Sequence, residues 1–447
     1  MDQQLDRSQL ETRALRLVEA AQKAGATAAD AVAVTGSSLG VNVRDGKVEG
    51  SERSESNAVS LRVFVGQRVA SVSTNSDSNL DELAARAVEM AKVTPEDPYA
   101  GLADENRLLK HIPQLDLCDP RALSADELRD KALEAEAAAL EVAGVTKSGG
   151  AGASWGLGGL VLATSHGFLG SYERSRSGVS ATAIAGEGTQ MERDYDFDSR
   201  TYVDELASAH TIGTNAGKRA VARLNPRKIE TCKAPIYYEP RMAGSLLGHF
   251  AGAISGTAIA RGTSFLKERM GEQVFGKHIQ IIDDPHKPRS AATTPFDGEG
   301  TAAQTLRLIE DGRLTSWLLD SASARELGLQ PNGRARHTGS STSPSITNLT
   351  LQAGDISPEE LFRQIGDGLL VTSLIGHGAN GITGDYSRGA SGFWVENGEA
   401  VYPVSEITIA GNMKDMFMQL TPASDLDDRY AVAAPTVAVE GMTIAGA

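Results

Sequence analysis

The chain has 447 residues, of which 40% are hydrophobic and 23% are charged, a composition typical of a globular protein. At about 100–200 residues per domain, this length predicts two or three packed units. The formal net charge of −15 argues against non-specific nucleic-acid binding, which depends on a basic surface that displaces counterions from phosphates.

The sequence shows no sign of membrane insertion or export. No run of about 18 apolar residues appears, so we expect no membrane span. The acidic start, residues 1–6, has neither the basic nor the apolar region of a signal peptide. The two cysteines, Cys118 and Cys232, fit free thiols in a reducing compartment better than a disulfide. We therefore expect a cytoplasmic protein.

Residues 1–230 combine amphipathic helices with antiparallel strands. Ser124 and Glu127 have the spacing of a capping box, which predicts the start of a helix that ends near Val142. Asp45-Gly46 and Gly66-Gln67 separate strand-like segments, which predicts an antiparallel meander. Further predicted helices cover residues 80–93 and 202–223, and predicted strands cover residues 39–44, 60–65, 68–73, 160–164, 168–173 and 179–185.

Residues 231–447 contain short strands and many hairpins. Asp311-Gly312 and Asn397-Gly398 predict two-residue turns. A helix of small residues is predicted over residues 241–260. Because strands and helices cluster rather than alternate, we predict an α+β fold with mixed and antiparallel sheets and flanking helices. We divide it into two domains, residues 1–230 and 231–447.

Two short motifs resemble functional signatures but lack the context that those signatures need. Gly376 to Gly381 spells G-x-G-x-x-G, yet a loop rather than a helix follows it, so nucleotide binding is disfavoured. Ser154 lies in a G-x-S-x-G pattern, but no helix follows to expose it as a nucleophile. A glycine-rich turn is the better prediction there.

A catalytic zinc needs about three protein ligands, and the histidines are poorly spaced for this. None of the eight histidines is followed by Glu, and no two lie three to five residues apart. The dense acid–histidine group is Asp283, Asp284 and His286. Pro285 lies within it and favours a charged turn, so a metal site there is the weaker interpretation.

Long stretches of the C-terminal half resemble the TldD/PmbA family. The resemblance rests on GLLVTSLIGHGANG at residues 368–381, TGDYSRGASGFW at 383–394 and YPVSEITIAGNMKDM at 402–416. FDGEG at residues 296–300 and LLDSASARELG at 318–328 extend it upstream. Weaker matches at residues 44–49 and 65–69 bring in the N-terminal sheet, so the resemblance covers essentially the whole chain.

This resemblance implies an α+β subunit of a cytoplasmic peptidase that works as a two-chain assembly. In the family, the TldD branch carries His-Glu-x-x-x-His on a helix and a cysteine as third ligand. The PmbA branch, also called TldE, lacks these ligands and pairs with a TldD-type chain. Such pairs are implicated in trimming peptides, including bacteriocin precursors and antitoxins, and the name "modulator of DNA gyrase" recurs.

The helix at residues 241–260 places this chain in the PmbA/TldE branch. If His249 is the first histidine of the motif, then Phe250 takes the position of the general base. The second ligand falls on Ala253 or Ile254, and no cysteine follows Cys232. We therefore expect no catalytic residue and no metal in this chain, with zinc in a TldD-type partner.

The favoured prediction is a metal-free subunit that forms a heterodimer with a TldD-type chain, acts on peptides and binds no nucleic acid. A homodimer is possible when the chain is purified alone. We expect a peptide to pair with strands beside the loop at 376–392. His377, Asp385, Tyr386 and Arg388 are candidates for lining that cleft, and the alternative is that Asp385 and Arg388 only fix a glycine-rich turn.

Two alternatives belong to other functional classes. The first is an independent hydrolase with a metal at Asp283, Asp284 and His286. The second is a non-enzymatic protein that acts directly on gyrase.

Overall fold

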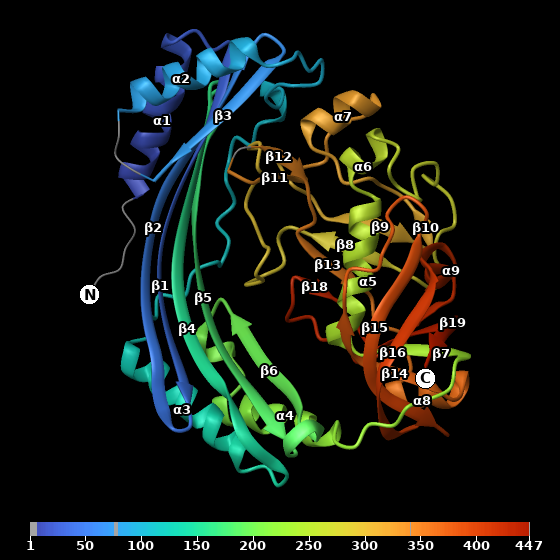
Figure 1. The fold of residues 1–447 in the computed structure, drawn as a ribbon. Coiled ribbons are helices and arrows are strands. Elements are labelled where there is room, and N and C mark those ends of the chain that lie inside the picture. Colours follow the sequence, from blue (N-terminus) through green and yellow to red (C-terminus); the bar gives the residue numbers. More distant parts are fainter. Residues whose placement is uncertain (1–6, 76–78, 340, 447) are drawn as a thin grey trace.

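Two antiparallel meanders join edge to edge and form one long six-stranded sheet. The computed structural model describes residues 7–75, 79–339 and 341–446, and the sheet forms a curved wall along one side (Figure 1). The strand order is β3-β2-β1-β4-β5-β6, so β1 and β4 join the two meanders. The strands are β1 (Ala28–Arg44), β2 (Lys47–Val65), β3 (Arg68–Thr74), β4 (Val145–Thr164), β5 (Leu169–Ala185) and β6 (Glu192–Arg200). The predicted first meander is confirmed.

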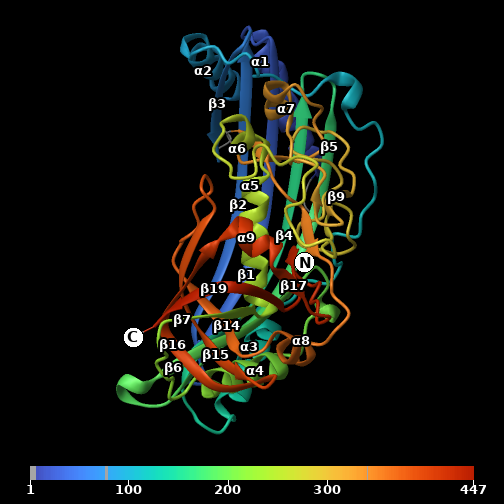
Figure 2. The same cartoon turned by 90° about the vertical axis from the view of Figure 1, so that its right-hand side faces the viewer.

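Four of these strands are much longer than predicted. Strands β1, β2, β4 and β5 span 17, 19, 20 and 17 residues, and they run along most of the height of the molecule (Figure 2). Their middle parts are rich in Gly and Ser, which interrupt the apolar alternation that identifies a strand. The segment around Ser154 lies inside β4, so the predicted turn is wrong. Pairing with β1 on one side and β5 on the other keeps this segment extended.

Four helices cover one face of the sheet, two toward each end (Figure 1). Side chains alternate along a strand, and the odd-numbered residues of β1 and β4 point toward these helices. Ala31 and Ala163 belong to the core under α1 and α2, whereas Val41 and Ala153 belong to the core under α3 and α4. The helices are α1 (Arg7–Lys23), α2 (Leu80–Val93), α3 (Ala125–Leu140) and α4 (Ala209–Ala222), and the short 3₁₀ turns are η1 (Glu105–Arg107), η2 (Gly188–Gln190) and η3 (Val203–Glu205).

Capping side chains set the starts of two of these helices. Ser124 and Glu127 make the predicted reciprocal capping box at α3. The helix predicted from residue 202 begins only at Ala209, because Ser208 accepts a hydrogen bond from Thr211 N and caps α4 there. No helix in the described ranges is long and apolar enough to cross a membrane.

The C-terminal half contains a closed barrel and a smaller sheet. The barrel order is β16-β15-β14-β7-β19, closed by pairing of β19 with β16, and β17 pairs with β19 outside the ring. Its strands are β7 (Cys232–Tyr238), β14 (Gly368–Ile375), β15 (Asp385–Glu396), β16 (Glu399–Asn412), β17 (Leu420–Pro422) and β19 (Val437–Ala445). The other strands are β8 (Ile281–Asp284), β9 (Leu306–Glu310), β10 (Arg313–Leu314), β11 (Ala335–His337), β12 (Thr342–Pro344), β13 (Asn348–Leu351) and β18 (Val432–Ala433).

The hairpins predicted in this half are confirmed, and so is the α+β class. Asp311-Gly312 joins β9 to β10, and Asn397-Gly398 joins β15 to β16. The barrel is a closure that the sequence patterns did not reveal. The division into two domains at residue 230 stays a prediction.

The helix predicted over residues 241–260 is broken into two. Helix α5 (Pro240–Ala253) ends before α6 (Gly256–Ala260), and Gly256 N donates instead to Leu318 O at 2.8 Å. This outside partner replaces an intrahelical bond and starts a new helix axis. The remaining helices are α7 (Ser321–Leu327), α8 (Pro358–Ile365) and α9 (Met413–Met418).

Arginine side chains fasten the long sheet to the C-terminal half. Arg62 of β2 forms a buried ion pair with Asp30 of β1, and its Nη1 donates to Thr342 Oγ1 at 2.8 Å. Arg174 of β5 donates from Nη1 to the carbonyl oxygen of Ala291 at 2.5 Å. The two halves are therefore joined by directional bonds as well as by apolar packing.

Close approach of β14 and β15 in the barrel requires glycine at position 392. A Cβ at Gly392 would lie 1.8 Å from Leu370 O, whereas a Cβ at Gly389 would meet nothing closer than 3.5 Å. We expect Gly392→Ala to lower the free energy of unfolding by about 1–3 kcal/mol, through overpacking. Gly389→Ala on the same strand should change it by less than about 0.5 kcal/mol. Urea denaturation of both variants checks this, and equal effects would contradict the close approach.

Candidate functional site

His249 lies on α5 with its ring against β15. Helix α5 carries Pro240 in its first turn, where the fixed φ of proline suits a helix start, and it packs Leu246 and Phe250 into the C-terminal core. The ring of His249 is half-buried, and its centroid lies 5.9 Å from that of Tyr386 at an interplanar angle of 76°. Packing of the helix therefore fixes the position of the imidazole.

The other positions of the expected metal motif lie in the apolar core. Phe250 and Ile254 are fully buried, and Ala253 is 4% exposed. The Phe250 ring makes an edge contact with Phe275 at 5.4 Å between centroids. None of these three side chains offers an atom that can bind a metal or move a proton.

Three buried polar atoms around His249 have no hydrogen-bond partner among the described residues. They are His249 Nε2, Tyr386 Oη and Arg388 Nε. Strand alternation sends Tyr386 and Arg388 to the same side of β15. Tyr238 of β7 is fully buried nearby, and its hydroxyl donates to Met442 Sδ at 3.5 Å.

This environment keeps the imidazole neutral and the phenols protonated. Burial lowers the pKa of His249, and the positive charge of Arg388 lowers it further. Burial and the neighbouring Tyr386 raise the pKa of Tyr238. Among residues within the described ranges, no three His, Cys, Asp or Glu side chains gather closely enough to hold a metal ion. The residues around His249 therefore do not fit a zinc ion.

The structure brings two of the four predicted cleft residues to His249 and leaves two at the surface. Tyr386 and Arg388 face inward. Asp385 is exposed, and its carboxylate accepts hydrogen bonds from Thr383 Oγ1 at 2.6 Å and Asn412 Nδ2 at 3.1 Å, which lower its pKa. His377 is exposed on the loop between β14 and β15.

One edge of β14 is free where this loop begins. The strand pairs with β7 only over Leu369–Val371, whereas it pairs with β15 through to Ile375. Among the described strands, the backbone of residues 373–375 therefore has a sheet neighbour on one side only. An extended chain can pair with such an edge.

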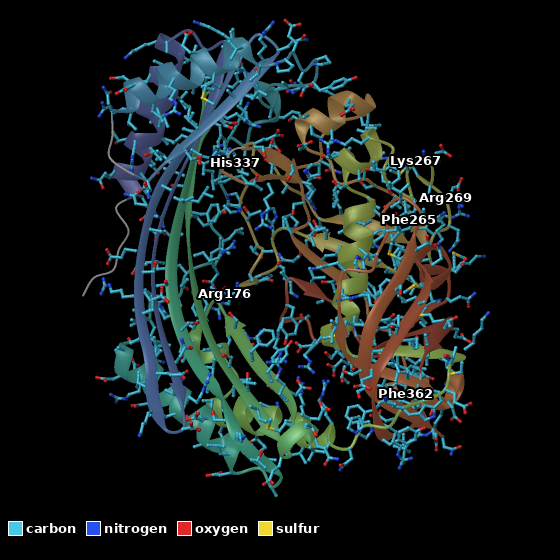
Figure 3. All side chains as sticks on the ribbon, viewed as in Figure 1. Arg176, Phe265, Lys267, Arg269, His337 and Phe362 are labelled. Carbon is cyan, nitrogen blue, oxygen red and sulfur yellow. The ribbon has the colours of Figure 1, made fainter. Side chains whose placement is uncertain are left out.

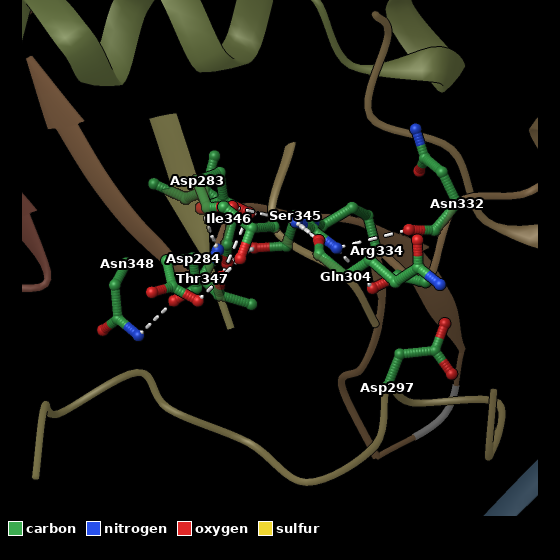
Figure 4. Close-up of polar contacts among 12 residues, drawn as sticks. Asp283, Asp284, Asp297, Gln304, Asn332, Arg334, Ser345, Ile346, Thr347 and Asn348 are labelled. Carbon is green, nitrogen blue, oxygen red and sulfur yellow. Dashed lines mark hydrogen bonds and ion pairs between the residues drawn. The ribbon is translucent and has the colours of Figure 1, made fainter. Parts of the chain in front are cut away.

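In the acid–histidine group considered as an alternative metal site, the two carboxylates already accept hydrogen bonds from other parts of the protein (Figure 4). Arg334 Nε donates to Asp283 Oδ2 at 2.5 Å, and both side chains are 0% exposed. Thr347 N donates to Asp283 Oδ1 at 2.8 Å. Asp284 accepts a bond from the backbone N of His286, whose side chain is exposed. These bonds are those of a buried ion pair and a charged turn.

Arg174 lines three hollows. Two of them lie between the inner face of the sheet and the C-terminal half, and the other is an open groove lined by strands of the sheet alone. Their volumes are about 300, 420 and 280 Å³. Figure 3 shows Arg176 of β5 beside the middle of the sheet and His337 of β11 nearer the upper end, where this strand of the C-terminal half meets the sheet.

Our reading of the sequence missed this inner face. Tyr172, Arg174 and Arg176 occupy every second position of one strand, and such alternation places them on one face. This alternation in the sequence is the signal that could have identified the inner face. The strand was predicted to end at residue 173, so the two arginines fell outside it.

Removal of the Asp283 carboxylate is expected to destabilise the protein strongly. Asp283→Ala leaves the buried guanidinium of Arg334 without its counter-ion, which costs about 3–5 kcal/mol of unfolding free energy. Glu310→Ala removes an exposed partner of Arg307 and should cost at most about 1 kcal/mol. Denaturant titrations compare the two. A small loss of stability for Asp283→Ala would contradict a purely structural role. So would added zinc that stabilises the wild type but not the variant.

The pKa of His249 should respond to Arg388. Arg388→Gln removes the charge but keeps a polar side chain, so the pKa of His249 should rise toward its ordinary value. In the wild type, the folded state holds this ring neutral while the unfolded ring binds a proton. Proton binding by His249 in the unfolded chain therefore lowers the free energy of unfolding as the pH falls below about 6.5, the pKa of an unfolded histidine. NMR titration of the imidazole signals, with the His249 resonance identified by its loss in His249→Gln, measures the shift. An unchanged pKa would show that the guanidinium does not reach the ring.

Comparison with known proteins gives matches along most of the chain. Models of the PmbA/TldA metallopeptidase domain 1, central domain and C-terminal domain match residues 29–91, 118–224 and 231–446. The chain is 39% identical to "Metalloprotease PmbA" of Escherichia coli O157:H7, over 91% of this chain and 90% of that protein. It is 38% identical to the "Metalloprotease PmbA homolog" of Haemophilus influenzae, over 96% and 94% of the two chains.

Solved structures share the whole fold. The crystal structure of a proposed modulator of DNA gyrase from Bacteroides thetaiotaomicron superposes with a TM-score of 0.91 at 25% identity, covering 99% of this chain and 100% of that one. TldE from Thermococcus kodakarensis gives a TM-score of 0.85 at 20% identity, covering 97% and 99%. With domain matches along the sequence and relatives of nearly equal length, this chain belongs to the PmbA/TldD family.

Proposed function

We propose that this chain is the metal-free, PmbA/TldE-type subunit of a cytoplasmic heterodimeric peptidase. The observation that carries the proposal is the helix α5. In the TldD branch the corresponding helix holds the zinc ligands, whereas here His249 stands alone beside a guanidinium. Phe250, Ala253 and Ile254 are committed to the core. Catalysis then takes place on a TldD-type partner that binds zinc.

The names of the relatives support a role in proteolysis but do not require a metal in each chain. A protein can belong to a peptidase family through its scaffold while its partner holds the reactive groups. The subunit then contributes walls that position a peptide and exclude folded proteins. The free backbone edge of β14 offers one place where an extended substrate pairs with this chain.

The loop between β14 and β15 is the surface that we assign to partner binding. Ile375 at the end of β14 is 71% exposed and Ile382 on the loop is 61% exposed, so two large apolar side chains face solvent here. The loop is anchored, because Phe265 N donates to Gly381 O at 2.9 Å. Burial of exposed apolar side chains in a preformed loop favours association with a second chain.

The independent-hydrolase alternative lacks support from the geometry. It needs a metal at Asp283, Asp284 and His286, and Asp283 already binds Arg334 and Thr347. The gyrase alternative rests only on the names of structural relatives.

Cleavage of an unfolded peptide by this chain with and without a TldD-type chain from the same organism tests the proposal. We expect cleavage and stoichiometric zinc only in the assembly. Ile375→Asp combined with Ile382→Asp should weaken the assembly by about tenfold or more. Val93→Asp, at an 81% exposed position on α2, is the matched control and should have no effect. Size-exclusion chromatography and calorimetry measure association.

Two outcomes would overturn the proposal. Cleavage or stoichiometric zinc in the isolated chain would place the chemistry here. Recovery of gyrase rather than a TldD-type chain as the main partner from lysate would favour the regulatory alternative.

A further inference from the structure

Arg174 and Arg176 on the inner face lie near Arg336 of β11, and the three have no carboxylate partner among the described residues. Arg174 donates to backbone carbonyl oxygens, and Arg176 Nε donates to Ser199 Oγ at 2.6 Å. Arg176 and Arg336 are exposed. Both lie close enough to Arg174 to lower its pKa, in addition to the larger effect of burial.

This cluster is notable because acidic residues outnumber basic ones in the chain, 58 to 43. Like charges that gather without counter-ions repel each other and raise the local positive potential. An anion that binds among them relieves the repulsion. Guanidinium groups also match the geometry of a carboxylate, which accepts two parallel hydrogen bonds.

The hollow of about 300 Å³ beside Arg174 and Arg336 has both apolar and polar lining residues. Its apolar lining comes from β1, β4, β5 and the segments near residues 296 and 346, namely Val32, Leu160, Leu162, Tyr172, Phe296 and Ile346. The ring of Phe296 makes edge contacts with Phe168 and Tyr172. The carboxyl of Asp297 also lines the hollow, but it accepts backbone hydrogen bonds from Thr301 and Ala335 and is fixed there.

A shallow groove continues from the arginines along the sheet. This second hollow, of about 420 Å³, shares Leu160, Tyr172 and Arg174 with the first. Val34 and Arg176 also line it, and its remaining lining residues on the inner face are small: Gly36, Ser38, Ser54, Ser56, Gly156 and Gly158. Small side chains leave room for a polypeptide backbone to lie across the strands.

We propose that these features form a site for the C-terminal end of a peptide, which binds by its free α-carboxylate and an apolar last side chain. The carboxylate lies where Arg174, Arg176 and Arg336 gather, the last side chain enters the apolar part of the hollow, and the preceding residues follow the groove. This inference rests on the proposed function, since it names the part of a peptide substrate that this subunit holds.

The combination of features favours a peptide end over a free inorganic anion. Phosphate would satisfy the arginines but would leave the apolar part of the hollow without an occupant. An internal peptide segment without acidic side chains would fill the hollow but would bring no charge to the arginines, and the test peptide is of this composition. A terminal apolar residue satisfies both, and the groove accommodates the chain that precedes it.

Fluorescence anisotropy with the isolated chain tests the site directly. The probe is an unstructured peptide without acidic side chains, labelled at its N-terminus and ending in Leu with a free carboxylate. The same peptide with a C-terminal amide should bind about tenfold or more weakly, because it loses the charge-assisted bonds. A peptide ending in Ser should also bind more weakly.

Charge-removing variants locate the binding. Arg176→Gln and Arg336→Gln alter exposed side chains, so folding should persist, and each should bring the free-acid peptide toward the affinity of the amide. Arg307→Gln on β9 removes the same charge from a 62% exposed position and is the control, with no loss expected. Melting curves verify that all three variants are folded.

Three results would overturn the site. They are equal binding of acid and amide, unchanged binding by the Arg176 and Arg336 variants, or displacement of the peptide by an equal concentration of inorganic phosphate. Binding is measured without a partner, so its failure is separable from that of the proposed function. If the two-chain assembly cleaves peptides but the isolated chain does not distinguish acid from amide, only the site is overturned. If the isolated chain binds the free-acid peptide but no active assembly forms, only the proposed function is overturned.

Discussion

Successive side chains of a β-strand must point to opposite faces, and in this protein that constraint operates over strands of 17 to 20 residues. One face of the long sheet is apolar at both ends and is covered by helices. The other face is free to carry different chemistry. Near one end it carries apolar side chains, in the middle it carries Gly and Ser, and on β5 it carries arginines. A single sheet therefore supplies both the support of the N-terminal half and one wall of an internal space.

The sequence allowed the class of fold to be predicted because its local signals were strong. The Asn397-Gly398 turn and the Ser124 capping box each depend on a few adjacent residues, and both are present in the structure. The strand lengths were not predictable in the same way, because the Gly- and Ser-rich segment around Ser154 has no periodicity of its own. Pairing with distant strands holds it extended. The break after α5 and the closure of the barrel likewise depend on contacts between residues far apart in the chain.

The candidate site could be predicted only in part, for a related reason. The apolar identity of Phe250, Ala253 and Ile254 was visible in the sequence, and their burial agrees with it. The contacts of His249 with Tyr386, and the effect of Arg388 on it, depend on how α5 packs against β15. A positive charge in this position acts against a metal cation as well as against a protonated imidazole. The surroundings thus oppose zinc electrostatically, in addition to lacking ligands for it.

The bonds of Arg62 and Arg174 across the two halves bear on the mechanics of the internal space. Arg62 is buried with Asp30 and reaches Thr342, and Arg174 binds the backbone beside Ala291. Moving the walls apart would expose these bonds or leave buried charges without partners, which is costly. These bonds therefore hold the distance between the sheet and the C-terminal half nearly constant. If the proposed function holds, a fixed spacing of this kind favours a single extended chain over a folded domain.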